Sequence, residues 1–273
     1  MTGDELNPQA REMADESMVR NLAAQAEAIW PQERVLFARY HLPEDAQVLD
    51  AGCGTGEISV RIAQMLPRAR VLGIDIIDGH LEVARERSAL LGDRMRFEHR
   101  SIFELGLAAR QFDLVVCRHV LQAIPHADRA IAELVRVTKP GGWLHLVPED
   151  YLMINFERRR LDPDDFWGAG PRQFGSATGT DMRIGRHAYG ILRRLGLSDI
   201  MIDYVVVDPL RVPRKTFAAI WKAWRDGYAD AVSSHTSITH ERFVAYFDDM
   251  IATLDDPNGY GVWHVPVVAA RVP

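Results

Sequence analysis

Three closely spaced glycines and two acidic residues are the first residues in this sequence whose types and spacing indicate chemistry. Asp50 ends an apolar run, and Gly52, Gly54 and Gly56 follow at every second position. Glycines let the backbone adopt positive φ and let a ligand approach, because they have no Cβ atom. Asp75 ends the next apolar run along the chain. This pattern predicts a ligand site at the tips of two neighbouring strands.

The elements that must position these residues are indicated by the flanking apolar pattern. Val48 and Leu49 close a strand over Gln47–Asp50, and apolar residues recur at helical spacing from Ile58 to Leu66. A helix that begins directly after a turn directs its free N–H groups toward that turn. The sequence therefore predicts a strand, a glycine turn and a helix, with the second strand at Arg70–Asp75.

The carboxylate of Asp50 distinguishes between two kinds of nucleotide ligand. A dinucleotide site must accommodate a pyrophosphate, which an acid at the strand tip would repel. S-adenosylmethionine (SAM) instead carries a sulfonium and an ammonium and has no phosphate. The stretch resembles the first motif of class I SAM-dependent methyltransferases, and the alternative is an ordinary turn with incidental glycines. The resemblance implies that SAM is the cofactor and that its methionine and sulfonium end is held by Asp50, Gly52, Cys53, Gly54 and Gly56.

Asp75 is the candidate for the adenosine end of the cofactor. An acid at the second strand tip accepts hydrogen bonds from ribose hydroxyls in this type of sheet. The resemblance implies that Asp75 holds the ribose and that Ile76, Ser101 and Ile102 contact the adenine. The family more often has an acid at the position of Ser101, so the backbone N–H of Ile102 is the alternative contact. Without the motif around it, the alternative for Asp75 is a helix N-cap or a surface acid.

Further motifs extend the resemblance to about residues 45–148. A near-continuous apolar strand is expected at Gln111–Cys117, and the run Lys139-Pro140-Gly141-Gly142 ends the helix that follows. These motifs resemble the ubiquinone/menaquinone-biosynthesis-like branch of the methyltransferases, which is specific for SAM but not for one substrate. The resemblance also places Arg118 beside the cofactor, directly after this strand.

The family implies an α/β fold, a Rossmann-like sheet of seven strands with helices on both faces and a helical lid. We expect an N-terminal helical segment at 1–44, a SAM-binding core at 45–150, and the rest of the core at 151–273 with lid insertions at about 152–181 and 209–258. The last strand, within 261–272, should run antiparallel between strands five and six. Pro266 predicts a bulge there, or a strand that starts after it.

Two irregular features are expected outside the core. The apolar pattern from Asp15 to Tyr40 predicts two helices, with Pro31 in the first turn of the second. This segment either closes the ligand site or covers an edge of the sheet. The stretch 152–181 is rich in glycine, proline and aromatic residues, which predicts about thirty irregular residues with a functional role.

Methyl transfer from SAM needs alignment, exclusion of water and, for a protonated nucleophile, a general base. Side chains that follow strands four and five are the candidates, because ligands bind at that end of such sheets. They are His119, Glu149, Asp150 and Tyr151, with His187 on the next helix as a weaker candidate. The alternative roles are a loop histidine, helix caps and an exposed helix face. No metal-ligand spacing is visible.

The aromatic content of the two insertions predicts a small, apolar or aromatic acceptor, as in secondary metabolism, methylated at O, N or C. The aromatics could instead only pack the lid. Arg158-Arg159-Arg160 is expected to be a solvated helix face, and the alternative is contact with an acidic group of the substrate. A net charge of −6 argues against a nucleic-acid surface. The alternatives are a tRNA or protein methyltransferase and a regulatory protein that binds SAM without catalysis. A dehydrogenase is disfavoured by the glycine spacing.

The cysteine content and the apolar runs of the sequence bear on the location of the protein in the cell. Cys53 and Cys117 are the two cysteines among 273 residues, which indicates reduced thiols and a cytoplasmic location. No apolar run is long enough to span a bilayer, and residues 1–20 do not resemble a signal peptide, so no membrane association is expected. A homo-oligomer is compatible with the sequence but not required by it.

Overall fold

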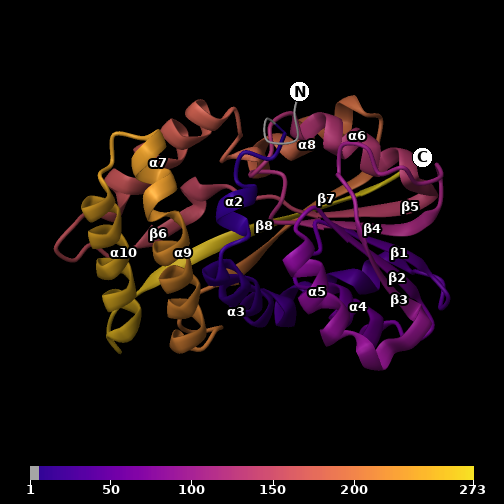
Figure 1. Ribbon diagram of the computed structural model, residues 1–273, viewed down its shortest axis with the longest axis horizontal. Coiled ribbons are helices and arrows are strands. Elements are labelled where there is room, and N and C mark those ends of the chain that lie inside the picture. The colour runs from indigo at the N-terminus through magenta and orange to yellow at the C-terminus, as the bar shows by residue number, and fades with distance from the viewer. Residues whose placement is uncertain (1–5) are drawn as a thin grey trace.

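A computed structural model describes residues 6–273 and contains one mixed sheet in the order β3-β2-β1-β4-β5-β8-β6, with β7 paired to β8 (Figure 1). The first five strands are parallel, and their apolar side chains are buried on both faces. Their carboxyl ends therefore lie at a common edge, where the candidate site residues follow. The strands are β1 (Gln47–Ala51), β2 (Arg70–Asp75), β3 (Met95–His99), β4 (Phe112–Arg118) and β5 (Thr138–Val147).

The last strand, β8 (Gly261–Arg271), runs antiparallel between β5 and β7 (Ser198–Val207), as the sequence predicted. The prediction of a bulge or a late start at Pro266 is wrong, because β8 continues through Pro266, which pairs with Tyr204. On its other edge β8 pairs with β6 (Ile154–Phe156) before Pro266 and with β5 after it. Pro266 lies in the gap between these pairings, where the strand tolerates it.

Helices cover both faces of the sheet and bury two separate apolar cores (Figure 1). One face carries α4 (Glu57–Met65) and α5 (Asp78–Arg87), which is followed by the 3₁₀-helix η2 (Ala89–Arg94). The other face carries α6 (Ala127–Val137) and α8 (Ile184–Arg194). Because neighbouring residues of a strand point to opposite faces, Val115 contributes to one core while Leu114 and Val116 contribute to the other.

The N-terminal segment differs from its prediction. It contains α2 (Ala10–Met13), a single helix α3 (Glu16–Glu33) that includes Pro31, and the 3₁₀-helix η1 (Leu36–Tyr40). The prediction that Pro31 begins a second helix is wrong. Proline removes one hydrogen bond to the preceding turn. In the last turn of a helix that packs against other helices on its buried side, this loss is tolerated.

The stretch 152–181 is mostly regular, so the prediction of thirty irregular residues is wrong. It contains the end of η3 (Tyr151–Met153), β6 and the helix α7 (Pro163–Thr178). The Asp162 side chain caps α7 by accepting from Asp164 N at 3.1 Å, and Pro163 occupies the first turn. The glycines in this segment argue against a helix when only the sequence is considered. Burial of the Phe166, Trp167 and Phe174 side chains stabilises the helix nevertheless.

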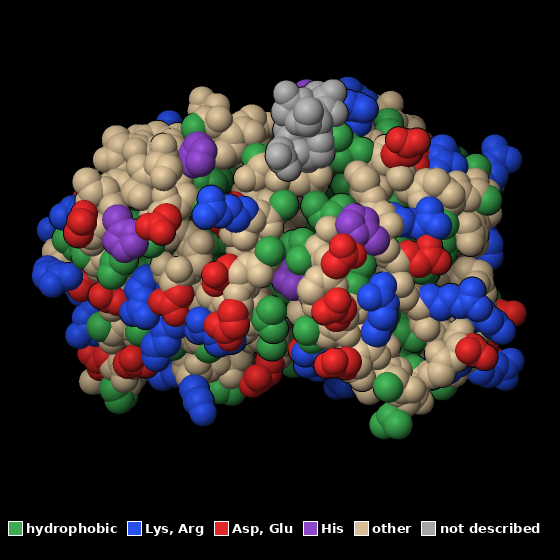
Figure 2. Space-filling model, viewed as in Figure 1, with side chains coloured by type: hydrophobic (Ala, Val, Ile, Leu, Met, Phe, Trp, Pro, Cys, Tyr) green, Lys and Arg blue, Asp and Glu red, His purple; other side chains and the backbone are tan. Residues whose placement is uncertain are grey.

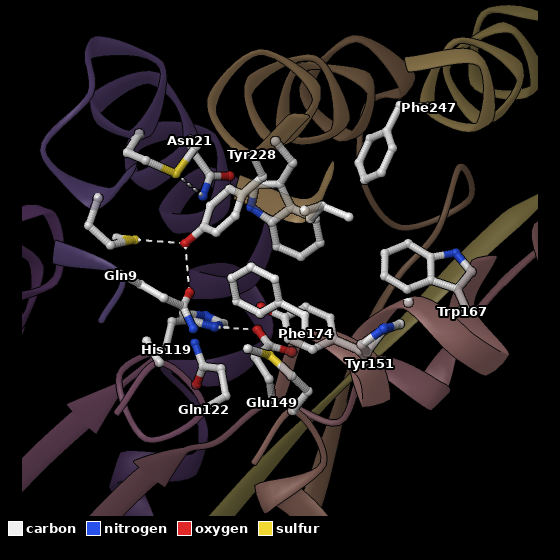
Figure 3. Close-up of a pocket in the computed structure, with 18 of the residues that line it drawn as sticks. Gln9, Asn21, His119, Gln122, Glu149, Tyr151, Trp167, Phe174, Tyr228 and Phe247 are labelled. Atoms are coloured by element: carbon white, nitrogen blue, oxygen red, sulfur yellow. Dashed lines mark hydrogen bonds and ion pairs between the residues drawn. The ribbon is translucent and has the colours of Figure 1, made fainter. Parts of the chain in front are cut away.

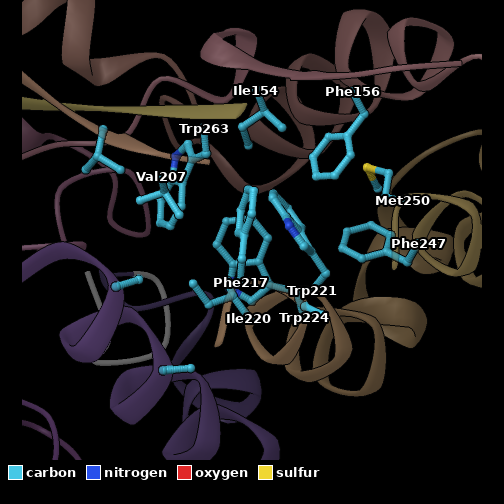
Figure 4. Packing of buried hydrophobic residues seen from close by; sticks show 14 of the residues in the cluster. Ile154, Phe156, Val207, Phe217, Ile220, Trp221, Trp224, Phe247, Met250 and Trp263 are labelled. Atoms are coloured by element: carbon cyan, nitrogen blue, oxygen red, sulfur yellow. The ribbon is translucent and has the colours of Figure 1, made fainter. Parts of the chain in front are cut away.

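A helical lobe lies beside the sheet and consists of α7, α9 (Arg214–His235), α10 (His240–Asp255) and the first residues of β8 (Figure 1). Its interior is an aromatic cluster around Trp221, which makes edge-to-face contacts with Phe156 and Trp224 (Figure 4). α3 packs against α9 and so joins this lobe to the sheet. Among the described residues, no helix is long and apolar enough to cross a membrane.

The surface is divided in the same way. In Figure 2, side chains of both charge signs are interspersed over the two lobes, while apolar side chains gather in the middle of the face, where the lobes meet. The middle of this face is the region of α2 and α3 in Figure 1. We therefore expect ligand cavities at the junction of the lobes.

Candidate active site

Two cavities meet at the carboxyl edge of the parallel strands. The first, here named the strand-tip cavity, measures about 760 Å³ with its mouth and lies against Gly52, Asp75, His80 and Ile102. The second, here named the aromatic cavity, measures about 810 Å³ with its mouth and lies between the sheet and the helical lobe. His119 lines both cavities. The two predicted ligand regions are therefore adjacent.

The glycine turn brings the backbone unusually close to its neighbours. Gly52 has φ +75°, and a Cβ atom added to it would lie 2.2 Å from Cγ2 of Val120. Gly56 has φ +72° and is the residue that precedes α4. Both positions therefore need glycine, and the turn floor of the strand-tip cavity stays open because Gly52 and Gly54 add no side chain to it.

Asp75 lies at the tip of β2 and organises the turn around it. Its Oδ2 accepts from Gly54 N at 2.8 Å, and its Oδ1 accepts from Ile76 N at 2.8 Å and from Ile77 N at 3.0 Å. A carboxylate offers about four acceptor positions, so capacity remains for a ligand hydroxyl. Asp75, Ile76 and Ile102 all line the strand-tip cavity. Ser101 is not among the residues that line it, and its hydroxyl accepts from Phe103 N at 3.3 Å.

His80 is a residue of this cavity that sequence reasoning missed. It is 3% exposed, its Nε2 has no partner among the described residues, and burial lowers its pKa. The ring is therefore neutral at pH 7 and offers an uncommitted nitrogen beside Asp75. The available signal was position, since the first turn of the helix that follows β2 must face the strand tip.

A smaller pocket adjoins the glycine turn and brings together opposite charges. Asp50 is buried, its Oδ2 accepts from Ser59 Oγ at 2.6 Å, and burial raises its pKa to about 6. Arg118 lines the same pocket, and its Nη2 has no partner among the described residues. Cys53 also lines it, with a thiol pKa raised by burial. A carboxylate and a guanidinium that line one pocket match the opposite charges of an amino-acid zwitterion.

Arg118 is held from behind by a fully buried acid. Its Nε donates to Glu33 Oε1 at 2.8 Å, and His145 Nε2 lies 2.9 Å from the same oxygen. The Tyr40 hydroxyl lies 2.7 Å from His145 Nδ1, so a ring protonated on Nε2 satisfies both neighbours. Burial of Glu33 is the largest single effect and raises its pKa, but the charges and hydrogen bonds of Arg118 and His145 together outweigh burial and the pKa falls to about 2.

His119 and Glu149 form a second buried pair at the junction of the two cavities (Figure 3). The His119 Nδ1 lies 2.5 Å from Glu149 Oε1, and Trp263 Nε1 donates to Glu149 Oε2 at 3.3 Å. His119 has φ +53°, an uncommon conformation for a residue other than glycine, and uncommon conformations cluster at functional sites. Its Nε2 has no partner among the described residues. This nitrogen is therefore free to accept a proton from a ligand.

The aromatic cavity has mostly apolar walls. Tyr151 stacks on Trp167 with ring centres 6.1 Å apart and contacts Trp224 edge to face. The predicted lid residues thus line a cavity as well as packing the lobe. Of the other candidates, Asp150 does not line the cavity. Its carboxylate accepts from Arg186 Nε at 2.6 Å and from Arg186 Nη2 at 2.9 Å. His187 is half exposed and is paired with Asp181. The lining aromatics are Tyr151, Phe166, Trp167, Phe174, Trp224, Tyr228, Phe243 and Phe247.

The strand order is that of a Rossmann-like α/β sheet, with Asp50 and Asp75 at the ends of neighbouring strands. Residues 42–153 match a family model described as a methyltransferase domain. Residues 42–153 are therefore similar to methyltransferase domains, and the resemblance inferred from the sequence is confirmed for this part of the chain.

Several curated proteins are similar to parts of this chain. A ubiquinone biosynthesis O-methyltransferase from Leptothrix cholodnii is 38% identical over 103 residues, which cover 37% of this chain and 43% of that protein. A trans-aconitate 2-methyltransferase from Deinococcus radiodurans is 34% identical over 159 residues, which cover 57% of this chain and 59% of that protein. The chain thus spans about half the length of these relatives.

A solved structure gives the same fold over nearly the whole chain. It is a phosphoethanolamine N-methyltransferase 2 from Haemonchus contortus in complex with S-adenosyl-L-methionine, with a TM-score of 0.59 and 18% identity. The match covers 97% of this chain and 60% of the other. The likeness concerns the fold, and it confirms the predicted α/β architecture with its Rossmann-like sheet.

The close approach at Gly52 generates a prediction about stability. Gly52→Ala should destabilise the protein by at least about 2 kcal/mol, because the new Cβ meets Val120 and the positive φ is strained. Gly79→Ala is the matched control, since a Cβ there has nothing within 4 Å and no positive φ is present. Urea denaturation of both variants checks this, and equal midpoints would contradict it.

The buried acid Glu33 generates a prediction about pH. Its pKa falls from 4.5 to about 2, so its contribution to stability is present above pH 4.5 and is lost as the pH falls toward 2. This difference corresponds to roughly 3 kcal/mol at neutral pH. Glu33→Gln should lose that stability and show a flatter profile below pH 4.5 in thermal melts.

Glu16→Gln is the control for this measurement, because Glu16 lies in the same helix and its side chain is 75% exposed. An exposed ion pair contributes little, so this variant should keep the wild-type profile. An acid profile of Glu33→Gln identical to wild type would show that Glu33 does not carry the dependence.

Proposed function

We propose that this chain binds S-adenosylmethionine in the strand-tip cavity and transfers its methyl group to a small molecule held in the aromatic cavity. The observation that carries the proposal is the position of His119, which lines both cavities and has a buried Nε2 without a partner among the described residues. When bound, SAM supplies an electrophilic methyl group on a sulfonium that is already a good leaving group. The protein has to hold, align and dehydrate the two reactants.

The residues of the strand-tip cavity fit the adenosine part of SAM. Asp75 has spare acceptor capacity for the ribose hydroxyls, and Ile76 and Ile102 offer apolar surface to the adenine. His80 adds an unpartnered nitrogen beside them. Gly52 and Gly54 let the ligand approach the turn.

The smaller pocket fits the methionine part. Asp50 suits the ammonium and the sulfonium side, and the unpartnered Nη2 of Arg118 suits the carboxylate. Glu33 accepts from the Nε of Arg118, so this hydrogen bond does not use the Nη donors of the guanidinium. Burial keeps these charges in a low-dielectric surrounding, where they act more strongly than in water.

The pair of His119 and Glu149 fits the role of general base. Glu149 accepts from Nδ1–H and thereby fixes the tautomer in which Nε2 carries the lone pair. The carboxylate also stabilises the imidazolium that forms when Nε2 takes a proton. Tyr151 fits a role in shaping the acceptor cavity, and Asp150 one in anchoring the chain after β5 through Arg186.

A small-molecule acceptor is favoured over tRNA or protein by the apolar lining of the aromatic cavity. A cavity lined by rings suits a compact ligand, and large acceptors need a basic groove. The N-terminal segment serves as one wall, because Met13, Leu22 and Gln9 line both cavities. The free thiols Cys53 and Cys117 are buried, which fits a reducing compartment such as the cytoplasm.

Cofactor binding can be measured by calorimetric titration with SAM, S-adenosylhomocysteine and NAD. The wild-type protein should bind the first two at micromolar concentration and not bind NAD. Asp75→Asn keeps the shape of the side chain but removes acceptor capacity and charge, and should weaken binding about tenfold or more. Asp78→Asn, with a side chain that is 72% exposed, should bind like wild type. A protein that binds none of these nucleotides would contradict the proposal.

The base can be tested through release of S-adenosylhomocysteine with a panel of phenolic and terpenoid acceptors. For an acceptor that is turned over, His119→Ala should lower kcat about 10²- to 10⁴-fold. Glu149→Gln should lower it less, because the ring keeps its Nε2 but loses its orienting charge. His187→Asn is the control and should retain activity. A protein that binds SAM and yields no product with any acceptor would favour the regulatory alternative.

A further inference from the structure

The aromatic cavity contains almost no charge. Among the described residues that line it, none is Lys, Arg or Asp, and its acid and its histidine are Glu149 and His119, already paired with each other. An anionic ligand would meet the Glu149 carboxylate without a cation to balance it. Burial of an unpaired charge is costly. The cavity therefore disfavours ligands that carry a carboxylate or a phosphate. Trans-aconitate and phosphoethanolamine, after which two of the similar proteins are named, are ligands of that kind.

Five of the described side chains that line the cavity carry a buried polar atom without a partner: the indole Nε1 of Trp167 among the rings, and four atoms of amides and of a histidine. Within the described part of the chain, Gln9 Nε2, Asn21 Oδ1, Gln122 Oε1 and His119 Nε2 are buried without a hydrogen-bond partner. Gln9, Asn21 and Gln122 are 4%, 4% and 6% exposed, and all four line the aromatic cavity. Figure 3 shows Gln9, His119 and Gln122 together at one end, with Trp167 and Phe247 at the other.

The chemistry of these atoms describes the ligand that would satisfy them. The Gln9 Oε1 accepts from the Tyr228 hydroxyl at 3.0 Å, and the Gln9 Nε2 is a donor without an acceptor among the described residues. The Gln122 Oε1 is an acceptor without a donor among the described residues. An unsatisfied buried polar group costs about 1–3 kcal/mol, so a ligand that pairs with both gains affinity. Oxygen groups that both donate and accept fit this requirement.

We propose, resting on the methyltransferase function above, that the acceptor is an uncharged apolar molecule with two neighbouring oxygen groups at one end. One is the hydroxyl that is methylated, held at His119 Nε2. The other is hydrogen-bonded by Gln9 and Gln122. The apolar body extends along the rings toward Trp167 and Phe247 (Figure 3).

The step that this arrangement supports is balanced by the residues present. The O–H bond of the acceptor breaks and its proton passes to His119 Nε2. An O–CH₃ bond forms as the CH₃–S bond breaks, which leaves a neutral ether and neutral S-adenosylhomocysteine. The imidazolium next to Glu149 then releases its proton to water. An ammonium acceptor lacks the lone pair that this step requires, although the rings and Glu149 could attract it.

Four probes with the same naphthalene body separate these possibilities. They are 2,3-dihydroxynaphthalene, 2-naphthol, 3-hydroxy-2-naphthoate and 2-naphthylmethylammonium. Each is titrated into wild-type protein saturated with S-adenosylhomocysteine, with quenching of tryptophan fluorescence as the readout, since Trp167 and Trp224 line the cavity. We expect the diol to bind at least tenfold more tightly than the carboxylate and the ammonium, and more tightly than 2-naphthol.

A variant assigns the second oxygen to its partner. Gln122→Leu should weaken the diol about five- to tenfold and leave 2-naphthol nearly unchanged, because only the diol has the extra group. Gln64→Leu, on the exposed face of α4, is the control and should change neither. Retained binding of S-adenosylhomocysteine shows that each variant is folded.

The outcomes separate this inference from the proposed function. Equal or tighter binding of the carboxylate or the ammonium would overturn the inference, as would an equal loss for diol and 2-naphthol in Gln122→Leu. If S-adenosylhomocysteine binds and no probe does, the inference fails and the cofactor assignment stands. If S-adenosylhomocysteine itself does not bind, the proposed function fails.

Discussion

The arrangement of the site depends on one fully buried carboxylate, Glu33. It binds Arg118 from the end of β4 and His145 from β5, and Tyr40 supports His145 from behind. Because a buried charge without a partner is strongly destabilising, α3 cannot move away from the sheet while Glu33 is ionised. The same helix supplies one wall of both cavities. A single electrostatic constraint thus fixes the N-terminal segment against the strand tips.

The two cavities on either side of His119 offer a ligand different environments. The strand-tip cavity and the smaller pocket beside it are lined by Asp75, Asp50 and Arg118, which together suit a polar ligand that carries charge at one end. The aromatic cavity is bounded by rings and by a few buried amides, which suits a neutral one. His119 stands where the two meet, and its Nδ1 is bound to Glu149 so that its other nitrogen is available. Chemistry between a charged donor and a neutral acceptor can therefore occur at a point that both reach.

The core of the fold was predictable because it rests on local, repeated patterns. Apolar runs ended by Asp50 and Asp75, the glycine turn and the antiparallel last strand all appear where the sequence indicated. The errors at Pro31, at Pro266 and in α7 share a cause, since each rests on a local propensity that packing overrode. Pro31 lies in the last turn of a helix packed on α9, and α7 forms around glycines because its aromatic side chains are buried.

The sequence by itself determined the class of fold, the turn that needs glycine and the acids at the strand tips, because these depend on residue type and spacing along the chain. Only the tertiary structure decided which side chains meet. It paired Glu33 with Arg118 and His119 with Glu149, assigned Asp150 to Arg186, and brought His80, Gln9 and Gln122 into the cavities. These contacts join residues far apart in sequence, and their partners are set by how helices pack on the sheet, which no local pattern encodes.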